Sequence, residues 1–294
     1  MATVTTPNLR TDPARYLEAE IKRFILESPD NRLKNVDGSP MFDEPLVGFA
    51  DGDDKLFRDY KTIIGEFHLT PKEVLQQAAG AAGDNGRRVS EASVVSWILP
   101  IAQTARLANR AMAEGPCLAW NNVRWHGQEL SNALARHVVT LIEQGGYRAV
   151  APDQASFFAQ RDLPNGRASN WSHRHVAYVA GLGTFSLTDG FITPRGIAMR
   201  TNSVVTDLKL PPSPRRYASH VANCPFLVDG SCGACIKRCP AGALSAKGHD
   251  KLRCREYMTA TLRPWLQRPG YGGSEAGCGL CQTKVPCEDR IPPM

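Results

Sequence analysis

The segment SCGACIKRCPAGAL (residues 231–244) carries three closely spaced cysteines, Cys232, Cys235 and Cys239, and the third is followed by Pro240. Eight of the nine cysteines of this 294-residue chain lie after residue 223, and Cys117 stands alone before them. A chain of this length can bury a hydrophobic core without covalent cross-links. The clustering therefore indicates that the thiols have a chemical function and are not needed as cross-links.

The composition indicates which use is expected. The first twenty residues have no apolar segment after a basic start, so we expect no secretory signal and a cytoplasmic protein. No apolar run is long enough to span a membrane. Thiols stay reduced in the cytoplasm, where clustered cysteines are typical of metal sites.

The spacing Cys-x2-Cys-x3-Cys-Pro matches the latter part of the bacterial ferredoxin pattern, in which the cysteine before proline ligates the neighbouring cluster. The earlier cysteine of that pattern would fall at position 229, which is Asp229, and the nearest substitute is Cys224. A second group follows, comprising Cys254 and the run Cys278-x2-Cys281-x5-Cys287.

Crossed ligation, as in two-cluster ferredoxins, divides the eight cysteines into two groups of four. One predicted [4Fe–4S] cluster is held by Cys224, Cys232, Cys235 and Cys287, and the other by Cys239, Cys254, Cys278 and Cys281. Structural zinc is the alternative. It explains neither the Cys-Pro step nor the 42 residues between Cys235 and Cys278, a gap wider than in zinc ribbons.

Local patterns predict a mixed α+β body before this module. Helices are expected from Pro13, capped by Asp12, after Thr70, at about 126–144, and over 172–183. Strands are expected at 93–101, 147–152 and 196–207. Prolines after residue 210 indicate a boundary, so we predict an α+β catalytic or cofactor domain at 1–210 and a ferredoxin-like di-cluster domain at 211–294.

The segments RHVAYVAGLGTFSLTDGFITPRGIAMRTNSVVTD (174–207), CGACIKRCPAGAL (232–244), RCREYMT (253–259) and CGLCQTKVPC (278–287) are similar to those of the epoxyqueuosine reductase and reductive dehalogenase superfamily. The resemblance covers about residues 120–290. It implies a nitroreductase-like cobalamin-binding domain and a reductase whose cobalamin is brought to Co(I) through two clusters. A low-potential donor of the ferredoxin or flavodoxin type and a small or nucleoside-like substrate are implied with it.

The sequence departs from this family at three places. An Arg-Asp-Tyr-His-type segment supplies the family's acidic proton donor, whereas the corresponding NVRWHGQEL (122–130) has no aspartate. The last motif is Cys-x2-Cys-x5-Cys in place of Cys-x2-Cys-x3-Cys-Pro, and the first cysteine has moved to Cys224. These changes leave cluster binding in place and put epoxyqueuosine itself in doubt as the substrate.

A reductive site needs a proton source near the reacting atom. The predicted catalytic residues are His126 and Arg124 at the expected start of the long helix, and His175 and Tyr178 on one helical face. Arg174, with Gly181 and Gly183, is predicted to contact the cofactor. The alternatives are surface histidines, polar residues at a domain seam, and glycines that merely close a helix. Cys117 is interpreted as a small buried apolar residue.

The formal charge of +6 comes from dispersed basic residues, and two clusters held by thiolates would make it less positive. Charge therefore does not support tRNA as a partner, although tRNA stays possible. No membrane partner is expected. The alternative from another functional class is a non-enzymatic electron-transfer or docking protein without a corrinoid.

Overall fold

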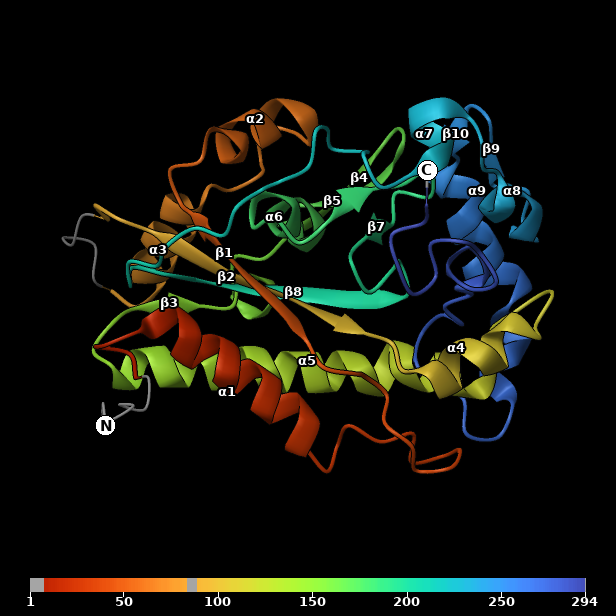
Figure 1. Cartoon of the computed structure of the whole chain (residues 1–294), viewed down its shortest axis with the longest axis horizontal. Coiled ribbons are helices and arrows are strands. Elements are labelled where there is room, and N and C mark those ends of the chain that lie inside the picture. Colours follow the sequence, from red (N-terminus) through yellow and green to blue (C-terminus); the bar gives the residue numbers. More distant parts are fainter. Residues whose placement is uncertain (1–7, 84–88, 294) are drawn as a thin grey trace.

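A four-stranded antiparallel sheet with the order β1-β2-β8-β3 crosses the body of the chain (Figure 1). The structure, a computed structural model, describes residues 8–83 and 89–293. The helices are α1 (Pro13–Glu27), α2 (Lys55–Ile63), α3 (Pro71–Ala81), α4 (Gln103–Arg110), α5 (Leu118–Gln144), α6 (His173–Val179), α7 (Pro225–Asp229), α8 (Ala234–Arg238) and α9 (Lys251–Glu256). The strands are β1 (Leu46–Asp51), β2 (Ser93–Pro100), β3 (Ala149–Val150), β4 (Gln160–Leu163), β5 (Gly166–Ser169), β6 (Thr184–Phe185), β7 (Phe191–Ile192), β8 (Met199–Thr206), β9 (Leu244–Ser245) and β10 (Gly248–His249).

Strand β2 lies inside the sheet, paired with β1 on one side and β8 on the other. All eight of its residues are buried, because helices cover both faces of the sheet. Burial on both faces explains why residues 93–101 form a continuous apolar run. The predicted strand at 93–101 is confirmed. The α+β class is confirmed as well.

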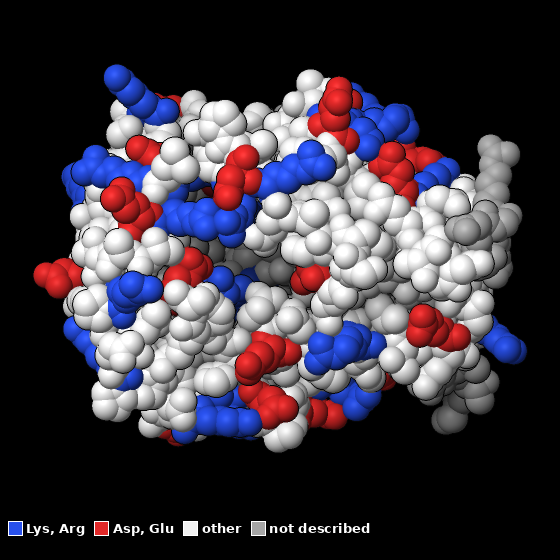
Figure 2. Space-filling view, turned by 180° about the vertical axis from the view of Figure 1, so that it is seen from behind, with Lys and Arg blue, Asp and Glu red and all other residues white. Residues whose placement is uncertain are grey.

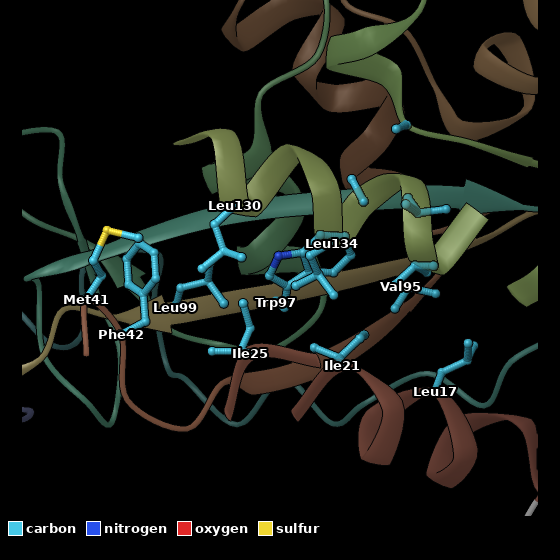
Figure 3. Close-up of a cluster of buried hydrophobic side chains, with 14 of the residues drawn as sticks. Leu17, Ile21, Ile25, Met41, Phe42, Val95, Trp97, Leu99, Leu130 and Leu134 are labelled. Atoms are coloured by element: carbon cyan, nitrogen blue, oxygen red, sulfur yellow. The ribbon is translucent and has the colours of Figure 1, made fainter. Parts of the chain in front are cut away.

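Helices α1 and α5 cover one face of the sheet (Figure 1). Figure 3 shows Leu17, Ile21 and Ile25 of α1 pointing toward Trp97 of β2 and Leu134 of α5. Asp12 caps α1 as predicted, since its side chain accepts a hydrogen bond from the Arg15 backbone N–H at 3.2 Å. The spacing of apolar residues along α1 thus places one stripe in the core.

Helices α2, α3 and α6 cover the opposite face. The Trp171 ring stacks between Phe57 of α2 and His68, and its indole N–H donates to the Ser203 hydroxyl of β8 at 3.0 Å. The predicted capping box of α3 is present, with reciprocal hydrogen bonds between Thr70 and Glu73. The short α6, which carries three candidate site residues, is therefore anchored to the sheet through Trp171 and β8.

Helix α5 begins at Leu118, eight residues before the predicted start near 126. The prediction was wrong because the first turns bear no simple apolar stripe. Their polar side chains are buried against the C-terminal part of the chain: Asn121 donates to the carbonyls of Gly272 and Ala276, and Asn122 donates to that of Gly270. Cys117 caps the helix, its sulfur accepting from the Trp120 N–H at 3.3 Å.

The cysteine-rich part docks against α4 and the first half of α5 (Figure 1). The carboxylate of Glu288, only 1% exposed, meets Arg106 at 3.1 Å and Arg110 at 2.8 Å. Backbone N–H groups of Ile197 and Ala198 donate to the carbonyls of Cys287 and Glu288. Ion pairs and backbone hydrogen bonds thus hold the end of the chain to the body.

The proline-rich segment after residue 210 runs along the edge of the sheet. Ser213 exchanges two hydrogen bonds with the backbone of Phe49 in β1, and Leu210 is buried. The boundary predicted near residue 210 stays a prediction. Within the described residues, no helix is both long enough and apolar enough to cross a membrane.

We predict an acid-sensitive step in stability that depends on His68. This side chain is fully buried, its Nε2 accepts the Ser172 N–H at 3.2 Å, and burial lowers its pKa to about 4. Between pH 6.5 and 4 the unfolded chain binds a proton that the folded chain does not. Stability is therefore lost as the pH falls through this window, by roughly 2 kcal/mol at pH 5.

The measurement is the drop in melting temperature between pH 7 and pH 5. His68→Gln should reduce this drop, because glutamine keeps an acceptor and cannot be protonated. The matched control is His126→Gln, because His126 is exposed. An unchanged drop in the His68 variant would contradict the assignment.

We also predict that Glu288→Ala destabilises the fold by about 3 kcal/mol, because it leaves the buried Arg106 and the Lys284 N–H without a main acceptor. Urea unfolding followed by circular dichroism measures the change. Glu27→Ala removes an exposed partner of Arg23 and should cost no more than about 0.5 kcal/mol. If both substitutions lowered the free energy of unfolding equally, the contacts of Glu288 would contribute no more to stability than an exposed ion pair.

Candidate functional site

Four cysteines line one small cavity of about 20 Å³ beneath α7 and α8: Cys224, Cys232, Cys235 and Cys287. These four are called the first cysteine set. Burial raises the pKa of Cys235 to about 11, and the nearby charges of Cys224 and Cys232 add to the rise. Burial and the other three cysteines of the set raise that of Cys287 to about 12. The structure thus brings together residues that lie up to 63 positions apart.

The second cysteine set is Cys239, Cys254, Cys278 and Cys281. Burial raises the pKa of Cys278 to about 12, with Cys254 and Cys239 contributing through their charges. Burial also raises the pKa of Cys281 far above its ordinary range, and the other three members of the set act on it in the same direction. Cys235 of the first set acts on Cys281 too, so the two sets are neighbours.

Asn109 at the end of α4 supports the second set. Its side-chain amide donates to the carbonyl of Cys278 at 3.4 Å and to the Thr283 hydroxyl at 3.2 Å, and its oxygen accepts from the Cys117 N–H. Gly279, between the two cysteines of CGLC, has φ +66°, and a Cβ there would lie 2.0 Å from the Trp120 indole. Only glycine fits this turn against α5.

Cys117 belongs to neither set, because its sulfur caps α5. It is half-buried, and burial raises its thiol pKa. In the part of the chain that the structure describes, no three or more His, Cys, Asp or Glu side chains form a group that could hold a metal ion.

Two further cavities adjoin at α6. The larger cavity has a volume of about 780 Å³, and the smaller cavity has a volume of about 610 Å³. Both are lined by Ser169, Ser172 and Arg174. The first is bounded by α2, the β4–β5 hairpin and α6, and the second by α5, α6 and β8. Figure 2 shows one side of the molecule with basic and acidic side chains interspersed and a hollow near its centre. Both volumes are in the range that small-molecule and cofactor sites occupy.

Residues close to both cysteine sets line these two cavities. Ser186 lines both the 20 Å³ cavity of the first cysteine set and the larger cavity. Ile197 lines both that 20 Å³ cavity and the smaller cavity at α6. Gln282, next to Cys281, lines the smaller cavity, and Lys251 of α9, the helix that carries Cys254, lines the larger one. Residues near both sets therefore reach a space that could hold a reactant.

Helix α6 brings three of the predicted residues together at the larger cavity: Arg174, His175 and Tyr178. Burial, with the charges of His68, Arg174 and Lys251, lowers the pKa of His175 to about 3, so its ring is neutral at pH 7. The Ser172 hydroxyl is bonded to its Nδ1 at 2.8 Å. The Arg174 side chain is solvent-accessible but surrounded by the cavity wall, and this desolvation lowers its pKa.

The other predicted residues lie elsewhere or have structural uses. Arg124 lines the smaller cavity and pairs with Glu275 at 3.2 Å, but His126 is exposed, pairs with Glu129, and lines neither cavity. The expectation for His126 assumed that the helix starts there. A Cβ at Gly181 would meet Pro214 and one at Gly183 would meet Ile192, so both glycines pack against backbone.

Residues that the sequence reasoning did not select complete the smaller cavity. Arg200 of β8 and Asp153 line it together with His173. His173 bonds the Ser203 hydroxyl through Nδ1 at 2.9 Å, and its Nε2 lies 3.4 Å from the Asp153 carboxylate. Asp153 lies in a 3₁₀ turn (Pro152–Gln154) that starts two residues after strand β3, and an acidic residue shortly after a strand is a usable signal. Arg200, inside a strand, has no comparable local signal.

Comparison with known proteins gives one curated match. An epoxyqueuosine reductase of Bacillus anthracis is 32% identical over 119 residues, which are 39% of this chain and 29% of that relative. The matched segment thus spans less than a third of the relative's length. No family model matches the sequence.

Two solved structures share part of the shape. An epoxyqueuosine reductase from Bacillus subtilis, with its catalytic loop swung out of the active site, has a TM-score of 0.46 at 18% identity and covers 95% of this chain and 70% of that one. A selenomethionine-labelled epoxyqueuosine reductase has a TM-score of 0.48 at 19% identity, with the same coverage. The similarity to epoxyqueuosine reductase that the sequence motifs predict is confirmed by the curated match over 119 residues.

Proposed function

We propose that the chain is an iron–sulfur oxidoreductase in which two [4Fe–4S] clusters deliver electrons to a reactant held in the cavities beside α6. The observation that carries the proposal is the grouping of eight distant cysteines into two neighbouring sets of four, with residues near both sets lining the larger and the smaller cavity. A non-enzymatic carrier needs no such cavities next to its clusters. A reductase does.

The residues of both sets fit a cluster by their chemistry. Cysteine ligates metal as the thiolate. Without metal, the buried thiols of Cys235, Cys278 and Cys287 resist ionisation, and their neighbours in each set oppose it further. Iron bound at each set offsets both costs. In a [4Fe–4S] cluster each thiolate binds a different iron, so the four sulfurs need not converge on one ion.

The cavities support a large cofactor with a smaller reactant beside it. Leu56, Ile63 and Phe185 give the larger cavity an apolar wall suited to a broad ring, whereas the lining of the smaller one is mixed and includes three arginines and a histidine. We propose cobalamin for the larger cavity on the strength of the family resemblance and this fit. When bound, cobalamin supplies a strongly reducing cobalt centre.

The chain's own residues hold the reactant and provide a proton. His173 and Asp153 line the smaller cavity together, with the His173 Nε2 3.4 Å from the Asp153 carboxylate, and we propose His173 as the general acid. The Ser203 hydroxyl fixes the orientation of His173. His175, with its pKa near 3, stays neutral and serves as a hydrogen-bonding wall residue. The segment 122–130, where the family has its acidic proton donor, contains no aspartate, so His173 takes this role.

We propose a small or nucleoside-like molecule as the substrate and a low-potential protein of the ferredoxin or flavodoxin type as the electron donor. The relative's name refers to epoxyqueuosine. The lack of the family's aspartate in the segment 122–130 argues for a different substrate. Interspersed surface charge on the side seen in Figure 2 gives no support to tRNA as a partner.

The first test is metal analysis with an absorption spectrum, on protein made anaerobically with cobalamin supplied. We expect about eight irons per chain, as two [4Fe–4S] clusters require, and one cobalt. Eight irons without cobalt after reconstitution would favour the electron carrier. A chain that binds zinc and no iron would overturn the proposal.

The second test separates ligands from the ninth cysteine. Cys239→Ser should lower the iron content from about eight to about four per chain, because it removes one ligand of one cluster. Cys117→Ser is the matched control and should keep all the iron, since serine retains the cap of α5. Electron paramagnetic resonance of the reduced protein identifies the cluster that remains. Equal iron loss in both variants would refute the ligand assignment.

A further inference from the structure

The smaller cavity carries a concentration of positive charge that the proposed electron transfer does not use. Three guanidinium groups line it, from Arg124, Arg174 and Arg200, against the single carboxylate of Asp153. Asp153 is itself engaged by Asn202 at 3.4 Å and faces His173. The cavity therefore has an excess of cations.

Arg200 has the least compensated charge of the three. In the described part of the chain no carboxylate lies within ion-pair distance of it, and its one hydrogen-bond partner is the side-chain oxygen of Gln128 on α5. The Gln128 amide donates to Asn132 at 2.8 Å, which turns the oxygen toward Arg200. Burial and the neighbouring charge of Arg124 lower the Arg200 pKa to about 9, so it remains charged at pH 7.

Arg174 and Arg124 leave further donors free. Arg174 donates to the backbone carbonyl of Asp189 and, among the described residues, has no carboxylate within ion-pair distance. Arg124 uses one N–H on Glu275 and lies over the Trp125 ring, 4.5 Å from its centroid. A guanidinium carries five N–H donors in a fixed fork, so each of the three retains donors for another oxygen ligand.

An uncompensated charge in a partly desolvated cavity is unfavourable unless a partner joins it. Resting on the proposed function, we propose that the smaller cavity selects a substrate bearing an anionic oxygen group, a carboxylate or a phosphate, which Arg200 and Arg174 bind with the help of Arg124. The anion sits beside the His173–Asp153 pair. This replaces an acid-centred site with a cationic one and makes Arg200 a specificity-determining residue.

A second arginine-rich cavity provides the internal control. It measures about 250 Å³ and is lined by Arg106, Arg195 and Arg290. Each of these is already paired with a carboxylate, from Asp43, Glu288 or Asp289. If unpaired guanidinium groups decide anion binding, this cavity should take up no added anion.

The test is isothermal titration calorimetry of the anaerobic full-length protein with inorganic phosphate and, separately, with succinate, at constant ionic strength. We expect binding of at least one of the two anions, and the stronger one identifies the group. Arg200→Gln should weaken it at least tenfold and Arg200→Lys by a smaller factor, because lysine keeps the charge and loses the fork. Arg195→Gln should leave it unchanged.

Three results would overturn the inference: no binding of either anion, unchanged binding in Arg200→Gln, or an equal loss in Arg195→Gln. Iron is measured in the same samples. A variant whose iron content equals that of the parent protein has a correctly folded cysteine-rich part. A parent that binds the anion but holds no iron would refute the proposed function and leave the anion site standing.

Discussion

The placement of the cysteine-rich part depends on one buried carboxylate, Glu288. It lies almost fully enclosed between Arg106 and Arg110 and also accepts the Lys284 N–H at 2.7 Å. A charge so deeply buried is tolerated only with full hydrogen bonding, so the loop around it has few alternatives. Cys287 immediately precedes it, and the backbone pairing with Ile197 and Ala198 continues the contact. The position of the first cysteine set follows from this anchor.

Helix α5 performs the complementary task for the second set. Its first turns carry Asn121 and Asn122, which satisfy backbone carbonyls of residues 270–276, and Trp120, against which Gly279 turns. Its last turns belong to the hydrophobic core beneath the sheet, together with Leu134 and Ile142. One helix thus joins the core to the cysteine loops. Rigid support of this kind holds the side chains of a site in fixed positions.

Local signals in the sequence were sufficient wherever a short-range interaction decides the structure. The Asp12 cap with Pro13, the Thr70–Glu73 capping box and the apolar run of β2 each act within a few residues. Local signals failed where contacts with segments distant in the sequence determine the structure. The first turns of α5, the β4–β5 hairpin and α2 were not predicted, because their stability comes from burial against distant segments. His126 was assigned to a site on the strength of a helix start that lies elsewhere.

The sequence by itself determined the number and spacing of the cysteines and predicted their division into two sets, because the ligand patterns of iron–sulfur clusters recur over short intervals of sequence. It also determined the α+β class through capping and burial periodicity. Only the tertiary structure decided what the cysteines adjoin and which polar side chains meet. Arg200 comes from β8, Asp153 from the 3₁₀ turn after β3 and His173 from α6, and no interval in the sequence relates them. Their convergence results from sheet pairing and helix packing, which act through space and not along the chain.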